Sequence, residues 1–256
     1  MLNKQITISN LKISYIDEGE GEPVLILHGW GANKEMFSSV VAHLSKKYRV
    51  VVPDLPGFGE SQEPPKAWCV ADYGVFADEF IKTLGLKNAV WMAHSFGGRI
   101  VLKIAPWCTY APKKIILVAS AGIKPKRGPK YYVKVYSYKL AKRLLTLPGL
   151  SRFTKKAYDR FRSKAGSTDY KNASDVMRAT LSLTVNEDLR GNLPKIKQST
   201  LLVWGDCDSA TPISDARLME SLLPDCGLAV LEGGTHFAFL EQNGRFLNII
   251  DYFLEH

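Results

Sequence analysis

Six short runs of continuous apolar residues, most of them bounded by glycine, proline or aspartate, recur along the chain. Runs of this kind, without polar alternation, are typical of strands that are buried on both faces of a parallel sheet. Most intervals between them have apolar residues at helical spacing, which predicts helices over Val75–Leu84, Ile213–Leu223 and Arg245–Leu254. Strands that alternate with helices predict an α/β fold with a doubly wound, mostly parallel sheet. The six predicted strands are Val24–Leu27, Val50–Val52, Ala89–Met92, Ile115–Ala119, Leu201–Trp204 and Leu228–Leu231.

The N-terminal segment has a different pattern. From Lys4 to Tyr15 apolar and polar residues alternate, which predicts two antiparallel strands and brings the expected sheet to eight. Polar residues near two helix starts indicate caps: we expect Asp72 to cap the first predicted helix, and Thr211 and Pro212 to begin the second.

One interval does not alternate. Between Ser120 and Thr200 no buried-strand run occurs, and apolar residues at three-to-four spacing over Tyr131–Leu147 predict a helix. A structureless loop of that length is implausible in a compact domain. We therefore expect an inserted helical cap, or lid, over residues 123–190, and an α/β core domain made of residues 1–122 and 191–256.

Charge is concentrated in this insertion. Between Lys124 and Lys164 there are 14 Lys or Arg residues and one acid, Asp159, a net charge of +13; the rest of the chain has 20 Lys or Arg and 24 Asp or Glu, a net charge of −4. Three interpretations are open: a solvated helix face, attraction of an anionic substrate, and weak peripheral contact with an anionic membrane. Nucleic-acid binding is not predicted, because the body is acidic and no recognised module is present.

The remaining composition points to a cytoplasmic protein. The longest apolar runs are far too short to span a membrane, and MLNKQITISN has no apolar signal region. The four cysteines are scattered, without CxxC pairs, so we expect free buried thiols and no bound metal or other cofactor. The sequence makes no prediction of oligomeric state.

The ends of the predicted strands carry the residues of chemical interest. The strand at Ala89–Met92 runs into Ala93-His94-Ser95-Phe96-Gly97-Gly98 and then into an apolar helix, Ile100–Ala105. A small-x-Ser-x-Gly turn between strand and helix exposes the serine hydroxyl, as in a nucleophile elbow. Taken alone, the pattern is also compatible with a glycine-rich helix start.

Three other strand ends agree with it. His28-Gly29-Trp30-Gly31 follows one strand and offers backbone N–H groups for an oxyanion, Asp206 and Asp208 follow another, and His236 follows the last. A serine hydroxyl needs a base to take its proton, and the base needs a carboxylate to hold its tautomer. All of these groups are expected at one edge of the sheet.

With these motifs, and with the stretch Asp54–Ser61, the chain resembles the α/β-hydrolase superfamily. The resemblance implies Ser95 as nucleophile, His236 as base and Asp208 as its orienting acid, because the family spacing Gly-x-x-Asp selects Asp208 over Asp206. It also implies an oxyanion hole formed by the amides of Trp30 and Phe96. Phe58 and the cap residues Tyr132 and Tyr136 are candidates for the substrate pocket.

These observations predict a cofactor-independent serine hydrolase that cleaves a small acyl substrate, foremost a carboxylic ester, through an acyl-enzyme. Thioesters, amides, lactones and carbon–carbon bonds stay open, because the family uses one triad for all of them. From other classes, the alternatives are a ligand-sensing regulatory protein that retains the triad, and an idle membrane- or partner-binding module.

Overall fold

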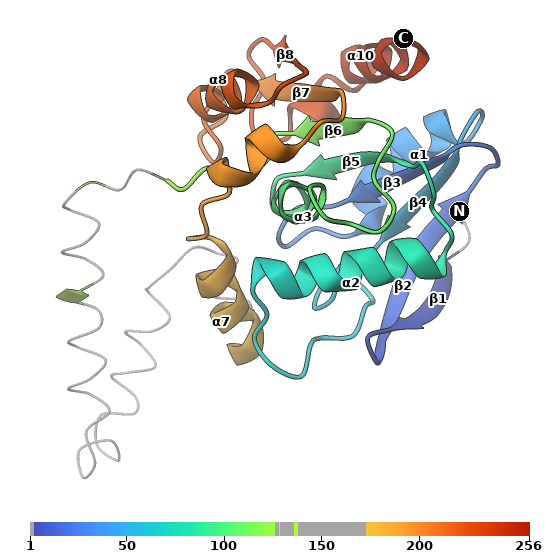
Figure 1. Ribbon diagram of the computed structural model, residues 1–256, viewed down its shortest axis with the longest axis vertical. Coiled ribbons are helices and arrows are strands. Elements are labelled where there is room, and N and C mark those ends of the chain that lie inside the picture. Colours follow the sequence, from blue (N-terminus) through green and yellow to red (C-terminus); the bar gives the residue numbers. More distant parts are fainter. Residues whose placement is uncertain (1–2, 126–127, 129–135, 138–172) are drawn as a thin grey trace.

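The computed structural model describes residues 3–125, 128, 136–137 and 173–256. Its strands are β1 (Asn3–Ile8), β2 (Leu11–Glu18), β3 (Pro23–Leu27), β4 (Arg49–Pro53), β5 (Val90–His94), β6 (Ile115–Val118), β7 (Thr200–Gly205) and β8 (Cys226–Leu231). They form one eight-stranded sheet in the order β1-β2-β4-β3-β5-β6-β7-β8 (Figure 1). β2 pairs antiparallel with β1 and with β4, and every other neighbouring pair is parallel. The predicted fold class is confirmed.

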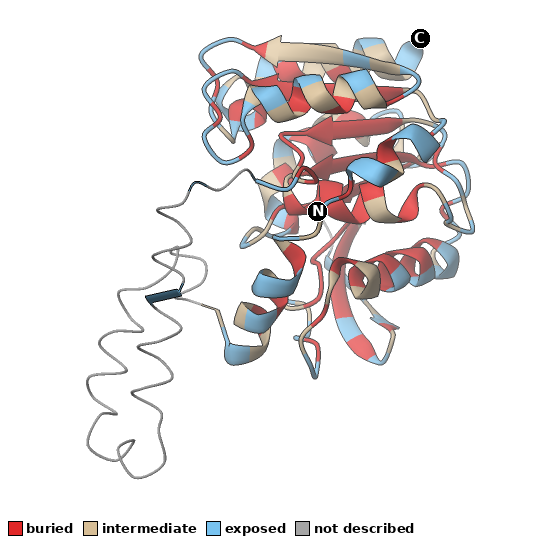
Figure 2. Cartoon of the chain, turned by 60° about the vertical axis from the view of Figure 1, so that its left-hand side comes forward, coloured by how far each residue is buried: buried red, intermediate tan, exposed pale blue. Residues whose placement is uncertain are grey.

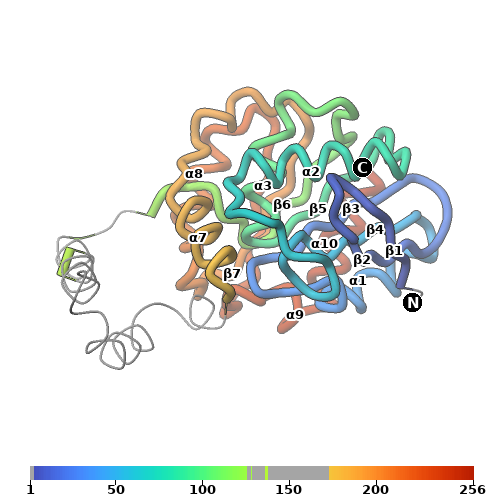
Figure 3. Tube along the Cα trace, turned by 90° about the horizontal axis from the view of Figure 1, so that it is seen from below, coloured from blue at the N-terminus to red at the C-terminus, as the bar shows by residue number. Residues whose placement is uncertain are grey.

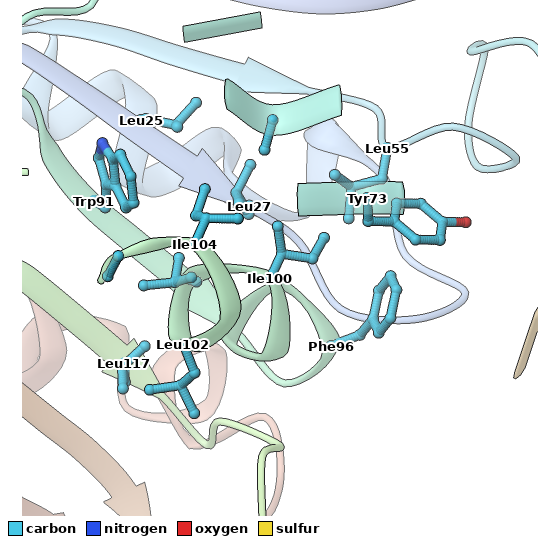
Figure 4. Close-up of a cluster of buried hydrophobic side chains, with 14 of the residues drawn as sticks. Leu25, Leu27, Leu55, Tyr73, Trp91, Phe96, Ile100, Leu102, Ile104 and Leu117 are labelled. Carbon is cyan, nitrogen blue, oxygen red and sulfur yellow. The ribbon is translucent and has the colours of Figure 1, made fainter. Parts of the chain in front are cut away.

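Helices cover both faces of this sheet because successive strand residues point to opposite sides. In β3, Leu25 and Leu27 pack with α2 (Val70–Thr83) and α3 (Phe96–Ile104), whereas Val24 and Ile26 pack with α1 (Ser38–Leu44) and α10 (Asn243–Glu255). Figure 2 shows the strands as mostly buried, and Figure 4 shows side chains from strands and helices meeting in the first of these layers. The helices are η1 (Lys34–Phe37), α1 (Ser38–Leu44), α2 (Val70–Thr83), α3 (Phe96–Ile104), α7 (Asp175–Thr184), η2 (Arg190–Lys195), α8 (Ile213–Leu222), α9 (Ala238–Glu241) and α10 (Asn243–Glu255).

The six predicted buried strands begin and end within two residues of the observed ones, and β2 runs three residues past Tyr15. The start of α2 was predicted wrongly. The helix begins at Val70, not at Val75, and its N-cap is Cys69. Asp72 is the third helical residue, and its carboxylate accepts a hydrogen bond from the Cys69 amide at 2.7 Å. Asp72 therefore satisfies a free amide at the helix start from inside the helix. At α8 the N-cap is Pro212 and not Thr211.

Part of the predicted cap lies outside the described residues, including Tyr132 and nearly all of the helix expected over Tyr131–Leu147. The division into a core and a 123–190 cap stays a prediction. Within the described ranges, no helix is both long and apolar enough to cross a membrane. All four cysteines are free. The expectation that they are buried was wrong, because Cys207 is exposed and the other three are only partly buried.

Candidate active site

Ser95 lies between β5 and α3, in a backbone conformation that few residues adopt. Its φ is 48° and its ψ is −107°, in the left-handed half of the Ramachandran plot. Such a conformation costs about 1–3 kcal/mol in most proteins and persists only where the surroundings impose it. Here α3 approaches β3 so closely that a Cβ on Gly97 would lie 2.3 Å from the carbonyl oxygen of Leu27. The elbow expected from the small residues around Ser95 is therefore present as a sharp strand–turn–helix.

Two hydrogen bonds connect Ser95, His236 and Asp208. Ser95 Oγ lies 3.0 Å from His236 Nε2, and His236 Nδ1 lies 2.7 Å from Asp208 Oδ2. Because an ionised carboxylate can only accept, Nδ1 carries the imidazole proton and Nε2 is free to accept the serine proton. The three side chains that were expected at separate strand ends thus lie in contact, with the tautomer that a general base requires.

The Asp208 carboxylate is held in a cage of donors. Its Oδ1 accepts from the amides of Ala210 at 2.7 Å and Thr211 at 2.9 Å, and its Oδ2 accepts from the Thr211 hydroxyl at 2.7 Å. Burial raises the pKa of Asp208, but the hydrogen bonds from His236 and Thr211 outweigh it and lower the pKa below its usual value. Asp208 is thus an anion although its side chain has no exposed area.

Thr211 was not expected to belong to the site. Its hydroxyl also lies 3.1 Å from the Ala119 carbonyl and 3.3 Å from His236 Nδ1, and its carbonyl accepts from Trp204 Nε1. The available signal was the spacing Asp-x-x-Thr, in which a hydroxyl three residues after a carboxylate can turn back toward it.

Asp206, the other acid of this strand end, has a different place. It is exposed, and its Oδ1 accepts a hydrogen bond from the Gly233 amide at 2.7 Å. That bond ties the end of β7 to the turn after β8. Asp206 therefore supports the loop that carries His236 without contacting the imidazole ring.

Trp30 lies in the turn after β3, and Phe96, the first residue of α3, directly follows Ser95. In the part of the chain that the structure describes, neither backbone amide donates a hydrogen bond to a protein acceptor. Their rings meet edge to face with centroids 5.3 Å apart. A Cβ on Gly29, just before Trp30, would lie 3.3 Å from the Ser95 Cβ, so the two turns are in close approach. Unpaired amides beside a nucleophile are what an oxyanion hole requires.

Two buried histidines hold these turns. His28 donates from Nδ1 to the Gly29 carbonyl at 2.7 Å and accepts from the Leu55 amide at 2.9 Å. His94 donates from Nε2 to the carbonyl of His236 at 3.0 Å, and its Nδ1 has no partner among the described residues. Burial lowers the pKa of His28 to about 4 and, together with the nearby His236, that of His94 to about 3. Both rings are therefore neutral near pH 7.

A cavity of about 590 Å³ opens beside the serine. Its volume lies in the range of small-molecule sites. Ser95, His236 and Thr211 line it with mostly apolar residues, among them Ile123, Leu181 and Val185. The latter two come from α7 and its C-cap, which lie next to α3 (Figures 1 and 3).

Phe58 and Tyr136, the two described residues that were expected to bind substrate, are not among the described lining residues of the cavity. Phe58 does not line the described cavity wall; it is buried behind Trp30, with ring centroids 4.8 Å apart, and supports the wall from outside. Tyr136 is 65% exposed and is absent from the described lining, and Tyr132 lies outside the described residues. Two lining residues that we did not expect carry charge, Arg99 and Asp215. Burial and the nearby Asp208 raise the pKa of Asp215.

No group of three or more metal-ligating side chains occurs in the described ranges. Of the basic segment Lys124–Lys164, the structure describes only Lys124, Pro125, Gly128, Tyr136 and Ser137. The three interpretations of its charge stay predictions.

Comparison with known proteins agrees with this architecture. The family model for the alpha/beta hydrolase fold matches residues 22–242. A curated relative from Aliivibrio fischeri, a pimeloyl-[acyl-carrier protein] methyl ester esterase, is 27% identical over 252 residues that cover 93% of this chain and 95% of that protein. An esterase from Exiguobacterium antarcticum has a TM-score of 0.77 at 24% identity, and a bromoperoxidase from Bacillus anthracis has 0.78 at 21%; each match covers all of both chains. At these identities the structural likeness establishes the fold.

Proposed function

The chain belongs to the alpha/beta hydrolase fold family and is a hydrolase, and from this premise we propose that it cleaves carboxylic esters through an acyl-enzyme on Ser95. The observation that carries the proposal is the continuous contact from Ser95 Oγ through His236 to Asp208, at 3.0 and 2.7 Å. A serine hydroxyl becomes a competent nucleophile when a neutral imidazole can take its proton during attack.

Acylation begins when Ser95 Oγ attacks the ester carbonyl and its proton passes to His236 Nε2. The imidazolium that results is stabilised by Asp208, whose charge is held by Thr211 and Ala210. The negative charge on the former carbonyl oxygen is stabilised by the amides of Trp30 and Phe96. A single donor of this kind contributes about 2.7–4 kcal/mol in other enzymes.

Collapse of the tetrahedral intermediate breaks the bond to the alcohol, which leaves with the proton from His236 Nε2. Water then attacks the acyl-serine while His236 takes one of its protons, and the second collapse returns that proton to Ser95 Oγ as the carboxylic acid departs. The cycle consumes only the ester and one water molecule, and it releases the alcohol and the carboxylic acid with the enzyme unchanged. Microscopic reversibility requires the same groups in both halves.

The choice of ester bond rests on the methyl ester esterase among the relatives and on the mostly apolar cavity beside Ser95. We propose in addition that the acyl group is small. The positive charge of the segment Lys124–Lys164 would raise the local concentration of an anionic substrate if that segment lies near the cavity mouth.

Labelling and burst kinetics test the proposal. A fluorophosphonate probe should modify Ser95, mapped by peptide mass spectrometry, and a 4-nitrophenyl ester should release a burst of nitrophenol equal to the enzyme concentration when deacylation is slower than acylation. Ser95→Ala should abolish both signals. Ligand binding without a burst, unchanged in Ser95→Ala, would instead indicate a ligand-sensing protein.

A further inference from the structure

Arg99 is a buried cation on the helix that follows the nucleophile. It lies one helical turn after Ser95, is 3% exposed and lines the cavity. A charge in such a position is costly unless its donors are bonded. The mechanism above does not use it.

The guanidinium is bonded to the C-terminal end of another helix. Arg99 Nη1 donates to the Glu187 carbonyl at 2.7 Å, and Nη2 donates to the Val185 carbonyl at 3.1 Å. Val185 is the C-cap of α7, where the last carbonyls lack helical partners and the helix dipole favours a cation. The planar guanidinium holds its donors in a fixed geometry and can bond both carbonyls at once. A lysine ammonium is a point charge on a flexible stem and fixes the two carbonyls less rigidly.

The end of α7 that Arg99 binds is also the end that forms cavity wall. Leu181, Thr184 and Val185 line the cavity, whereas the first half of α7 is fixed elsewhere. Met177 packs against Gly57, and the Thr180 hydroxyl accepts from the Trp68 amide at 3.0 Å. Without Arg99 the wall-forming end would lose both of the hydrogen bonds that its backbone carbonyls accept from the elbow helix.

A second cation of α3 provides a natural control. Lys103 Nζ lies 2.7 Å from Glu187 Oε1, but both side chains are more than a quarter exposed. A partly exposed ion pair of this kind is screened by solvent and contributes little. It contacts a side chain and leaves the backbone carbonyls of the α7 end unaffected.

We propose that Arg99 is a positioning residue that determines which acyl groups the cavity accepts, because it fastens the wall-forming end of α7 to the helix of the nucleophile. The proposal rests on the proposed function in so far as the cavity beside Ser95 holds the acyl group. Arg99 acts on the substrate through α7 and takes no part in proton transfer.

The test compares Arg99→Met, Arg99→Lys and Lys103→Met with the wild type on 4-nitrophenyl acetate, butyrate and octanoate. In Arg99→Met we expect the acetate KM to rise about tenfold with kcat within about threefold, and the octanoate-to-acetate ratio of kcat/KM to rise at least about fivefold. Arg99→Lys should be intermediate, and Lys103→Met should match the wild type. An unchanged chain-length profile in Arg99→Met would overturn the proposal.

Hydrogen exchange separates this inference from the catalytic one. Peptides covering residues 181–187 should exchange at least about tenfold faster in Arg99→Met than in Lys103→Met or the wild type. Equal protection would refute the anchor. If the wild type neither reacts with a fluorophosphonate nor hydrolyses any ester, the proposed function fails, and the exchange rates still decide whether Arg99 fastens α7. Labelling of Ser95 in Arg99→Met at the wild-type rate shows that the elbow itself is intact.

Discussion

The hydroxyl of Thr211 lies 2.7 Å from Asp208 Oδ2, the same oxygen that His236 Nδ1 contacts at 2.7 Å. The two donors therefore share one carboxylate oxygen, while backbone amides occupy the other. Because the Thr211 hydroxyl bonds the same oxygen that faces the imidazole, its side chain helps to decide how strongly the anion favours the imidazolium.

Thr211→Val should lower kcat by about tenfold. A hydrogen bond to a charged group contributes about 1.5–3 kcal/mol, and relaxation of the anion in the variant offsets part of that loss. KM for a short ester should change little, since the hydroxyl binds the carboxylate. Thr211→Ser keeps the donor and should stay within about threefold of the wild type. Equal losses in the valine and serine variants would indicate that the methyl group matters instead.

Asp208→Asn should reduce kcat by roughly 10³–10⁴-fold, because an amide can donate to Nδ1 and so place the imidazole proton on Nε2, where it blocks the serine. Asp206→Asn is the matched control, since Asp206 is exposed and its carboxylate bonds the Gly233 amide rather than the imidazole of His236. We expect it within about twofold of the wild type, because surface changes of this kind have small effects. The assignment is wrong if the control loses as much activity as Asp208→Asn.

A buried ion cluster should stabilise the chain segment that follows Trp30. Lys34 is fully buried, with its Nζ 2.8 Å from Asp54 Oδ2 and 2.9 Å from Glu60 Oε2. Burial lowers the pKa of Lys34, but these carboxylates outweigh it and raise the pKa, so the residue stays charged. The cluster joins η1, a few residues after Trp30, to the Asp54–Ser61 turn.

Lys34→Met should therefore cost about 3–5 kcal/mol in the free energy of unfolding, because it leaves Asp54 buried without its cation. Urea unfolding at neutral pH measures the loss. Lys47→Met removes a comparable but exposed pair with Glu255, also 2.9 Å long, and should leave the free energy of unfolding nearly unchanged. Similar losses in the two variants would refute the role of the buried cluster.

The strands and three of the site residues could be predicted because their signals are local. An apolar run such as that of β3 is readable without knowing its neighbours. Ser95 directly follows β5, and Asp208 and His236 lie in the loops that follow β7 and β8. The start of α2 was missed because Cys69 caps it, and cysteine is no usual cap residue. Phe58 was placed in the pocket because its turn was recognised, but its packing behind Trp30 depends on tertiary contact.

Arg99 illustrates what could not be predicted. A single arginine in an apolar helix after the elbow is a visible irregularity, but its acceptors are backbone carbonyls 86 and 88 residues away. Backbone carbonyls carry no residue type, so no sequence pattern identifies them. Thr211 is the intermediate case, because its partner is only three residues away and the motif was present but was interpreted as a helix cap.

The two buried histidines predict how stability depends on pH. The folded-state pKa of His28 is about 4 and that of His94 about 3, and both imidazoles return to about 6.5 when the chain unfolds. Below pH 6.5 the unfolded chain binds protons that the folded chain does not, so the free energy of unfolding falls as the pH falls toward 4. Each histidine contributes a slope that approaches about 1.4 kcal/mol per pH unit in that window and contributes nothing above it.

Urea unfolding at several pH values between 7.5 and 4.5 measures this slope. His94→Gln replaces one titrating ring by an amide that can still donate to the His236 carbonyl, so the slope below pH 6 should fall by up to about 1.4 kcal/mol per pH unit. Asp208 does not add to this slope. Its pKa is lowered below 3.8, so its contribution to the free energy of unfolding is lost only in more acidic solution. A wild-type stability that is constant from pH 7.5 to 4.5, or a slope unchanged in His94→Gln, would show that these rings are protonated in the folded protein.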